Sequence, residues 1–136
     1  MGPTTQTTAG DGWAVGSLEG MGEGPGFRKV RKALGVTAFG VNAVVMPPGY
    51  RSGRHLHERQ EELYFVHRGT IEFTFDGGEM QVLGPGGFAR VDAATVRSMR
   101  NASETDDAVY VCVGGAGGYV GRDGVLPEGE ERRARA

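Results

Sequence analysis

Short runs of β-forming residues, separated by turn residues, dominate the sequence from residue 27 to residue 113. Nine such runs can be delimited, and they are rich in Val, Phe, Tyr, Ile and Thr, which are residue types enriched in strands. The runs are Phe27–Lys32, Thr37–Met46, Gly53–His57, Glu62–Arg68, Thr70–Asp76, Glu79–Leu83, Gly87–Val91, Thr95–Asn101 and Asp107–Val113. Almost no helical periodicity interrupts them. The pattern predicts an all-β fold, an antiparallel sandwich or barrel of the jelly-roll kind.

The predicted strands form one central domain with an extension at each end. With 136 residues the chain has the size of one ordinary domain. We expect the barrel over residues 27–118. Residues 1–26 form an arm that is poorly ordered unless it docks on a neighbour, with Trp13 as its docking point. Residues 119–136 form a C-terminal extension, expected as a solvated tail whose end, from Glu128 to Ala136, has no apolar face.

Composition excludes several classes of function. The net charge is -2 and the 15 Lys and Arg residues are dispersed, so there is no electrostatic case for nucleic acid. No run approaches the ~20 apolar residues that a membrane span requires, and no charged start with an apolar stretch indicates export. The single cysteine, Cys112, excludes an internal disulfide and fits a reducing compartment. We therefore expect a cytoplasmic protein without a nucleic-acid or membrane partner, with Cys112 buried in a core strand.

Two histidines and a glutamate stand close together in the middle of the chain. In an extended segment side chains alternate between two faces, so His55 and His57 point the same way. Glu62 opens the next predicted strand, and a short turn can bring its carboxylate beside the imidazoles. Such a set leaves coordination positions open and suits a catalytic Fe, Mn, Ni, Zn or Cu site better than a structural one. The alternative is an exposed histidine pair, with Glu62 in an ordinary ion pair with an arginine such as Arg97.

The spacing around these three residues resembles the first motif of the cupin superfamily. The matching positions are Gly49, His55, His57, Glu62 and Gly69, separated by five, one, four and six residues. The resemblance covers roughly Val36 to Gly115 and is closest to small, single-domain members with one conserved barrel. It implies an antiparallel jelly-roll β-barrel, also called a double-stranded β-helix, with a small-molecule pocket inside the barrel. It also implies that the two histidines and the glutamate are metal ligands.

The second motif of that family departs here from its usual form. The family usually has Gly, Pro, Gly, His and Asn, separated by five, one, two and three residues. Aligned backwards from the final Asn, the corresponding residues are Gly86, Asp92, Ala94, Arg97 and Asn101. Only Gly86 and Asn101 keep the family residue. Arg97 cannot take the place of the missing histidine ligand, because a guanidinium stays protonated and has no lone pair to offer.

The functional hypotheses therefore differ in the role that they give to Arg97. If a metal is held by His55, His57 and Glu62 alone, Arg97 can clamp an anionic substrate against the open face of the metal. The protein is then a small metal-dependent enzyme that oxidises, isomerises or hydrolyses a metabolite, with Tyr64 as a proton donor. If no metal binds, Arg97 pairs with Glu62 or with the ligand, and the protein is a metal-free binding or sensing module. Metal-free acid–base catalysis is a third option, and nothing in the sequence names the substrate.

Alternation assigns faces to the strands near the site. One face of the run from residue 62 carries Glu62, Tyr64 and Val66, the other face carries Leu63, Phe65 and His67, and on the later run Arg97, Met99 and Asn101 share a face. If both strands line the barrel, Tyr64 and Met99 belong to the pocket wall. The opposite apolar face needs a cover of its own, from a second sheet or a second subunit. Members of the family are often dimers, and we expect a homodimer.

Overall fold

The structure, a computed structural model, describes residues 2–128, and most of its regular elements are β-strands. In chain order the strands are β1 (Thr8–Gly10), β2 (Trp13–Val15), β3 (Gly26–Arg28), β4 (Gly40–Met46), β5 (Leu56–His57), β6 (Glu61–Arg68), β7 (Ile71–Phe75), β8 (Glu79–Leu83), β9 (Phe88–Val91), β10 (Arg97–Asn101), β11 (Ala108–Gly115) and β12 (Gly124–Val125). The helical elements in the described range are a 3-10 turn, η1 (Leu18–Gly20), and a short helix, α1 (Val30–Leu34).

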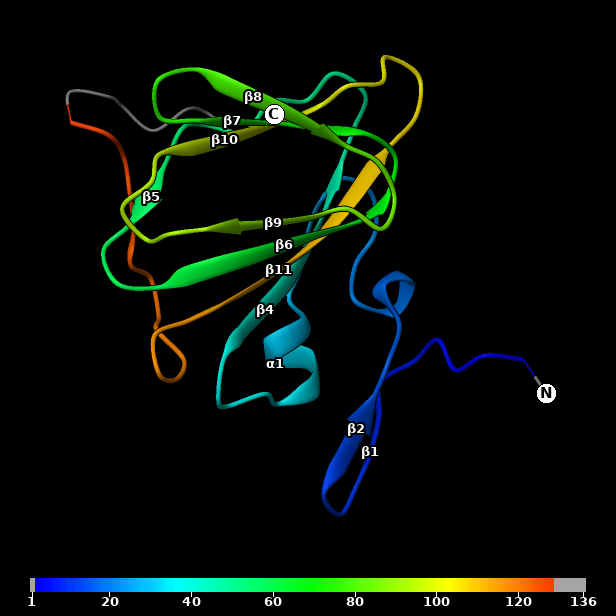
Figure 1. The fold of residues 1–136 in the computed structure, drawn as a ribbon. Helices are drawn as coiled ribbons and strands as arrows, with labels where there is room; N and C mark the ends of the chain where they lie inside the picture. Colours follow the sequence, from blue (N-terminus) through cyan, green and yellow to red (C-terminus); the bar gives the residue numbers. More distant parts are fainter. Residues whose placement is uncertain (1, 129–136) are drawn as a thin grey trace.

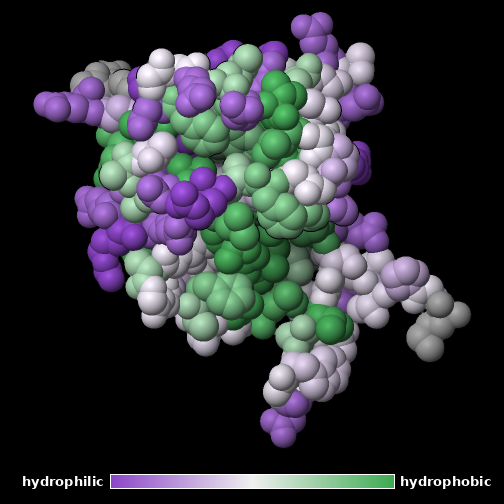
Figure 2. All heavy atoms as spheres, viewed as in Figure 1, coloured by the Kyte–Doolittle hydropathy of each residue, from purple (hydrophilic) through white to green (hydrophobic). Residues whose placement is uncertain are grey.

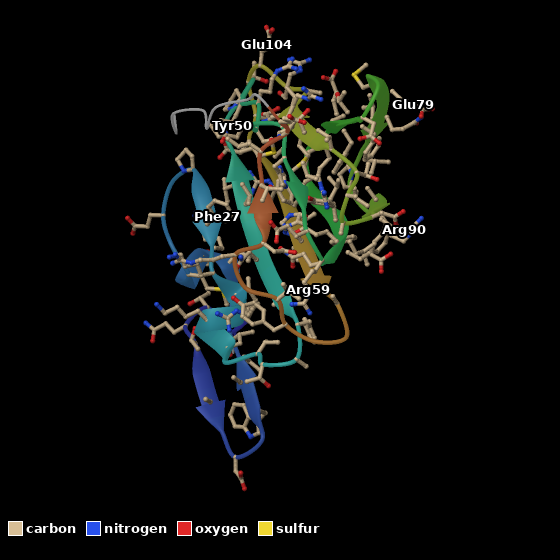
Figure 3. The ribbon with its side chains drawn as sticks, turned by 90° about the vertical axis from the view of Figure 1, so that its left-hand side faces the viewer. Phe27, Tyr50, Arg59, Glu79, Arg90 and Glu104 are labelled. Carbon is tan, nitrogen blue, oxygen red and sulfur yellow. The ribbon has the colours of Figure 1, made fainter. Side chains whose placement is uncertain are left out.

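Two sheets face each other and enclose the core (Figure 1). The larger sheet has the order β3-β4-β11-β6-β9, and the smaller one has the order β10-β7-β8. Phe27 on β3 and Arg90 on β9 mark the two edges of the larger sheet (Figure 3). The two-stranded ribbon of β5 and β12 lies at one end of the barrel, and all of these strand pairs are antiparallel. The predicted antiparallel jelly-roll β-barrel is confirmed.

The core lies between the sheets and contains the pocket-facing side chains predicted from alternation. On β6 the residues Glu62, Tyr64 and Val66 are buried, whereas Leu63 and His67 on the other face are exposed. On β10 the residues Arg97, Met99 and Asn101 are all buried. The core cluster consists of Met46, Tyr64, Val66, Ile71, Phe73, Val91, Met99, Ala108 and Tyr110. The period-2 alternation of the sequence therefore placed the inward and outward faces of these strands correctly.

Asn101 fastens the end of β10 to two neighbouring segments. Its Nδ2 donates to the backbone oxygens of Met46, Pro47 and Asp106, and its Oδ1 accepts from the backbone N–H of Ser103. The side chain is fully buried, so each of these bonds satisfies a polar group that has no access to water. Asn101 thus has a structural role at the end of β10.

One predicted strand is wrong in its second half. The run Phe27–Lys32 was expected to be one strand, but β3 ends at Arg28 and α1 begins at Val30. Lys29 leaves the extended conformation with φ -81° and ψ 73°. The helix then ends at Gly35, which adopts the left-handed conformation that terminates many helices. The residues from 31 to 34, Arg-Lys-Ala-Leu, are good helix formers, so the local propensity was present but too short to appear as a period.

The N-terminal arm folds back on itself. Strands β1 and β2 form a hairpin, and the Ser17 hydroxyl donates to the backbone oxygen of Thr4. The ring of Trp13, the expected docking point of the arm, lies against Gly10 of the same hairpin and is 55% exposed. The docking of Trp13 on a neighbour stays a prediction. The boundary of the arm at residue 26 stays a prediction.

The first part of the C-terminal extension was expected to be a solvated tail, but it pairs with a strand of the barrel. Residues Gly124 and Val125 pair with His57 and Leu56 to form β12 against β5. Asp123, directly before them, is buried. The extension from residue 119 thus returns to the barrel end instead of leaving it. The charged end that was expected to be solvated lies from residue 129 onward outside the described residues.

No helix among residues 2–128 is long and apolar enough to span a membrane.

The outer face of the larger sheet is apolar. Leu63 on β6 is 40% exposed and Phe88 on β9 is 61% exposed, and the rings of Phe65 and Phe88 lie 4.8 Å apart on this face. Val111 on β11 pairs with Phe65 and continues the surface. Figure 2 shows apolar side chains gathered over the part of the molecule where β4 and β11 lie. The homodimer stays a prediction, and this face is where we expect the contact.

We predict that the double substitution Leu63→Glu and Phe88→Glu converts a dimer to a monomer, because charges on this face oppose the burial of its apolar surface. Light scattering coupled to size exclusion measures the mass, which for one chain is 14.4 kDa. The matched control, Met80→Glu with Val82→Glu, changes two residues of similar exposure on the smaller sheet and leaves the mass unchanged. A monomeric wild type, or a variant that stays dimeric, contradicts this prediction.

Candidate metal centre

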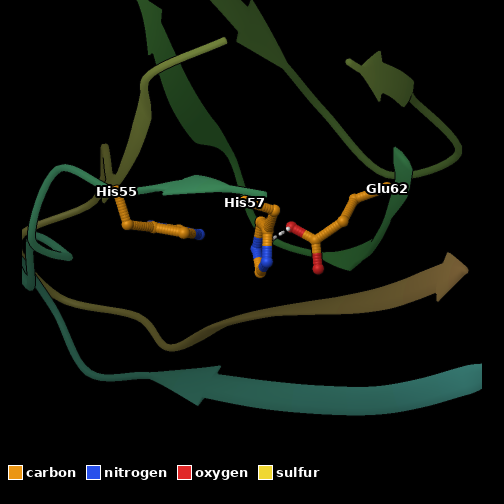
Figure 4. Close-up of side chains that lie close together, drawn as sticks. All are labelled: His55, His57 and Glu62. Carbon is orange, nitrogen blue, oxygen red and sulfur yellow. Dashed lines mark ion pairs between the residues drawn. The ribbon is translucent and has the colours of Figure 1, made fainter. Parts of the chain in front are cut away.

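His55 and His57 are brought to the site by the segment that runs beside β10. The backbone of His55 exchanges two hydrogen bonds with Arg97, with N–O distances of 3.0 and 2.9 Å. The two imidazoles project to the same side and meet edge to face, with ring centroids 5.2 Å apart. The ligand atoms of His55, His57 and Glu62 all lie within 4.8 Å of one another (Figure 4). The three residues that the sequence grouped together are therefore together in space.

The carboxylate of Glu62 is held by several donors at once. Its Oε1 accepts from the Tyr64 hydroxyl at 2.6 Å and from the Arg97 Nη2 at 3.2 Å, and its Oε2 accepts from the Cys112 thiol at 3.2 Å. A carboxylate has about four lone-pair positions. These bonds use three of them and leave one at Oε2. Glu62 is thus fixed in place while it keeps a lone pair for a ligand or a metal.

Arg97 is fully buried, and its guanidinium is engaged on every side. It donates to the Tyr64 hydroxyl, to Glu62, and to the backbone oxygens of Ala93 and Thr95. The side chain therefore lies behind Glu62 and is not among the residues that line the cavity described below. Arg97 is paired with Glu62, which is the alternative to a substrate clamp in the sequence analysis.

His57 is oriented by a residue that the sequence analysis missed. Its Nδ1 lies 2.8 Å from the Asp123 Oδ1, and the Asp123 Oδ2 accepts from the backbone N–H groups of Arg59 and Gln60. An ionised carboxylate only accepts, so the imidazole hydrogen lies on Nδ1 and points at Asp123. The Gln60 amide nitrogen also lies 2.9 Å from Nδ1, but the carboxylate is the acceptor for its hydrogen. Nothing in the sequence indicated Asp123, because it lies 66 positions from His57 and belongs to no motif with it.

This arrangement leaves the other nitrogen of His57, Nε2, without a hydrogen and facing the site. The Nε2 atom is buried and lies 3.0 Å from the Glu62 Oε1, an ion-pair distance, but the contact is not directed as a hydrogen bond. Two electron-pair donors face each other across this gap. A proton or a metal cation is needed to make the contact favourable.

The protonation of the two histidines follows from their surroundings. Burial, with the guanidinium of Arg97 nearby, lowers the pKa of His55. Burial acts on His57 in the same direction, but the carboxylates of Glu62 and Asp123 outweigh it and raise its pKa. His55 is therefore neutral near pH 7 and has a lone pair to offer. A metal at His57 has to displace a proton, so its apparent affinity falls as the pH drops.

The two carboxylates stay ionised. Burial favours the neutral acid at Glu62, but the contacts with His57 and Tyr64 reverse this and lower its pKa to about 2. At Asp123 burial acts the same way, and two backbone N–H donors together with His57 lower the pKa to about 2. Burial raises the pKa of Tyr64 and of Cys112 well above their usual values, so both keep their protons.

A cavity of about 640 Å³ opens onto this cluster. Its lining residues are Phe27, Lys29, Arg31, Lys32, Gly40, Val41, Asn42, Val44, His55, His57, Gln60, Glu62, Tyr64, Met99, Tyr110, Cys112, Gly114, Tyr119, Val120 and Arg122. The volume is in the range of pockets that hold small molecules. Tyr64 and Met99 belong to the wall, as alternation predicted.

The residues present fit a divalent transition metal. Two imidazoles and one carboxylate are the donor set of metal sites with open coordination positions. The buried Nε2 of His57 has no hydrogen-bond partner, and a metal would use its lone pair. The bond from His57 Nδ1 to a carboxylate is the contact that metal-binding histidines usually make with their other nitrogen.

Fold and site together define the class of protein: a jelly-roll barrel with a two-histidine, one-carboxylate cluster at the floor of its cavity. The sequence profile of the cupin domain matches residues 42–114, which is more than half of the chain. The chain belongs to the cupin family, and the resemblance inferred from the first motif is confirmed. No protein with a curated description matches the chain in sequence.

Several solved structures share the fold. An uncharacterized conserved protein with a double-stranded beta-helix domain from Klebsiella pneumoniae is 21% identical with a TM-score of 0.59, over 67% of this chain and 76% of that one. A sugar phosphate isomerase of the cupin superfamily from Silicibacter pomeroyi is 23% identical with a TM-score of 0.59, over 81% and 68%. The DMSP lyase from Ruegeria pomeroyi is 27% identical with a TM-score of 0.57, over 68% of this chain and 46% of that one. This chain thus spans less than half of the lyase.

We predict that Asp123→Asn lowers the affinity for Zn²⁺ by about 10- to 100-fold. The two backbone N–H groups that bond Asp123 will select the amide oxygen of Asn. The amide NH2 then faces His57 and forces the hydrogen from Nδ1 to Nε2, where it blocks the metal. Calorimetry measures the affinity, and long-range ¹H–¹⁵N NMR reads the tautomer of His57.

Asp92→Asn is the control, because Asp92 is an exposed carboxylate paired with Arg90. It leaves both the affinity and the tautomer unchanged. An Asp123→Asn protein that keeps the wild-type affinity and tautomer shows that Asp123 does not orient His57.

Proposed function

We propose that the protein is a metal-dependent enzyme that oxidises, isomerises or hydrolyses a small metabolite inside the barrel. The observation that carries this proposal is the buried, unpartnered Nε2 of His57, which faces Glu62 with His55 beside it at the floor of the cavity. A structural cluster of buried polar groups would be satisfied internally. This one keeps donor atoms directed into a space of small-molecule size.

Each residue of the site has a defined task in this proposal. His55 is kept neutral and His57 is oriented by Asp123, so each offers a nitrogen lone pair to the metal. Glu62 offers the lone pair left at Oε2 and stays ionised at physiological pH. A bound metal supplies a Lewis acid with open coordination positions for the substrate.

Arg97 and Tyr64 support Glu62 in this proposal. Arg97 neutralises part of the carboxylate charge from behind, and the Tyr64 hydroxyl bonds the same oxygen. Tyr64 also lines the cavity and keeps its proton, so it is our candidate for the group that donates a proton to the substrate. A direct clamp by Arg97 on the substrate fits less well, because four of its five N–H donors are already used inside the protein and its side chain is fully buried.

Among the structural neighbours the DMSP lyase from Ruegeria pomeroyi supports an enzymatic function. It is 27% identical to this chain, and its name describes an enzyme for a small molecule. The likeness does not transfer its substrate, because barrels of this kind support many reactions. A cytoplasmic location also remains a proposal and rests on the single cysteine.

A metal-free ligand-binding module is the second candidate. The observation in its favour is the ion pair of Arg97 Nη2 with Glu62 Oε1 at 3.2 Å, which places a permanent cation beside the carboxylate. In this candidate a proton on His57 takes the place of the metal, consistent with its raised pKa. The cavity then holds a ligand by hydrogen bonds and charge.

We predict that protein purified without chelator contains about one transition metal per chain, and that the double variant His55→Ala and His57→Ala contains none. The variant removes both nitrogen ligands and leaves Glu62 alone. Elemental analysis measures the metal, and circular dichroism confirms that the variant is folded. A metal-free wild type that also refuses added Fe, Mn, Ni, Cu and Zn shifts the assignment to the ligand-binding module.

We predict that Arg97→His binds divalent metal more tightly than the wild type. The backbone of residue 97 lies directly opposite His55, so an imidazole there adds a fourth ligand to the set. Arg97→Gln is the matched control, because it removes the cation without adding a ligand. The gain that Arg97→His shows beyond Arg97→Gln in a competition titration measures the new ligand. Equal affinities of the two variants contradict the placement of residue 97 beside the metal.

A further inference from the structure

Cations surround the outer part of the cavity. The chain has only two lysines, Lys29 and Lys32, and both line it together with Arg31 and Arg122. Both lysines and Arg122 are exposed, whereas the residues of the floor, His57 and Glu62 among them, are buried. The cavity therefore runs from an exposed cationic mouth to a buried floor that carries the candidate metal ligands.

The mouth is built from two segments far apart in the sequence. Lys29 and the start of α1 follow β3, and Tyr119 and Arg122 precede β12. The guanidinium of Arg31 lies over the ring of Tyr119, 4.0 Å from its centroid, and joins the two segments. Cations from both ends of the barrel domain are thus held around one opening.

The cations of the mouth are not used in ion pairs within the described part of the chain. Within residues 2–128 none of the four cations forms an ion pair, whereas Arg90, Arg97 and Arg100 each pair with a carboxylate. Among the described residues that line the cavity, Glu62 is the only carboxylate, and Arg97 forms an ion pair with it. The protein as a whole has a net charge of -2, so the excess of positive charge is local to this opening.

We propose that the mouth binds an oxyanion group of the substrate, a carboxylate or a phosphate, through Lys29, Lys32 and Arg122. The anion then lies at the exposed end of the cavity, and the reacting part of the same molecule reaches the floor at His55, His57 and Glu62. Several positively charged groups around one opening raise the local concentration of an anion and fix its orientation. This inference deepens the function proposed above and specifies its substrate class as small organic acids or phosphate esters.

The two lysines offer a selective probe. Reductive methylation with ¹³C-formaldehyde labels them and the amino terminus and keeps their positive charge. Inorganic phosphate and succinate are then titrated separately at low salt, because screening weakens exposed charges over a Debye length of about 10 Å at 0.1 M. Sodium chloride at matched ionic strength and glycerol serve as the ionic and neutral controls. We expect saturable shifts of both lysine signals with phosphate, with succinate or with both, and the tighter of the two assigns the class of anion.

Two variants locate the site. Arg122→Gln weakens anion binding at least about threefold, as one of three cations is lost. Arg59→Gln, an exposed arginine that does not line the cavity, leaves it unchanged (Figure 3). Shifts that do not saturate, that sodium chloride reproduces, or that Arg59→Gln reduces as much as Arg122→Gln overturn the proposal.

The same titration tests the anion site independently of whether the protein binds a metal. It is run first in protein treated with a chelator and then in Zn²⁺-loaded protein. Saturable shifts without metal establish the anion site at the mouth even if the His55→Ala and His57→Ala comparison finds no metal. Shifts that occur only in the presence of Zn²⁺ place the anion on the metal and overturn the proposal, while they leave the metal-dependent function intact.

Discussion

The buried carboxylate of Glu62 is the interaction on which the rest of the site depends. It lies at the floor of the barrel, where an ionised group without partners would be costly. Arg97, Tyr64 and Cys112 all donate to it, and His57 faces it at 3.0 Å. Removal of one partner from a buried pair typically costs about 3–5 kcal/mol, so the charge of Glu62 and the position of Arg97 are tightly coupled. Arg97 is thus the counter-ion of the buried glutamate of the candidate metal centre.

The segment after β11 and the segment that follows β3 both add residues to the site formed by the barrel strands. The segment after β11 returns along the barrel end, pairs with β5 and brings Asp123 to His57. Lys29, between β3 and α1, and Lys32, within α1, lie at the cavity that the same histidine lines. Floor and mouth are therefore determined by different parts of the sequence. The barrel strands supply the donor atoms, the segment after β11 orients one of them through Asp123, and cations from both segments line the entrance.

Regular patterns in the sequence predicted most of the strands and the faces of those that line the site. The alternation from Glu62 to Val66 placed the buried face of β6 correctly, because a strand repeats every two residues whatever its neighbours are. The run after Phe27 failed, because five helical residues are too few to establish a period against a strand-like beginning.

The sequence by itself determined the fold class and the three residues of the candidate centre, because His55, His57 and Glu62 lie close enough in the chain for local extended geometry to unite them. The tertiary structure alone decided the role of Arg97 and the presence of Asp123 and the lysines at the same cavity. Arg97 lies 35 positions from Glu62, and Asp123 lies 66 from His57. Contacts at such separations depend on how sheets and extensions close around the core, and no local periodicity encodes that closure.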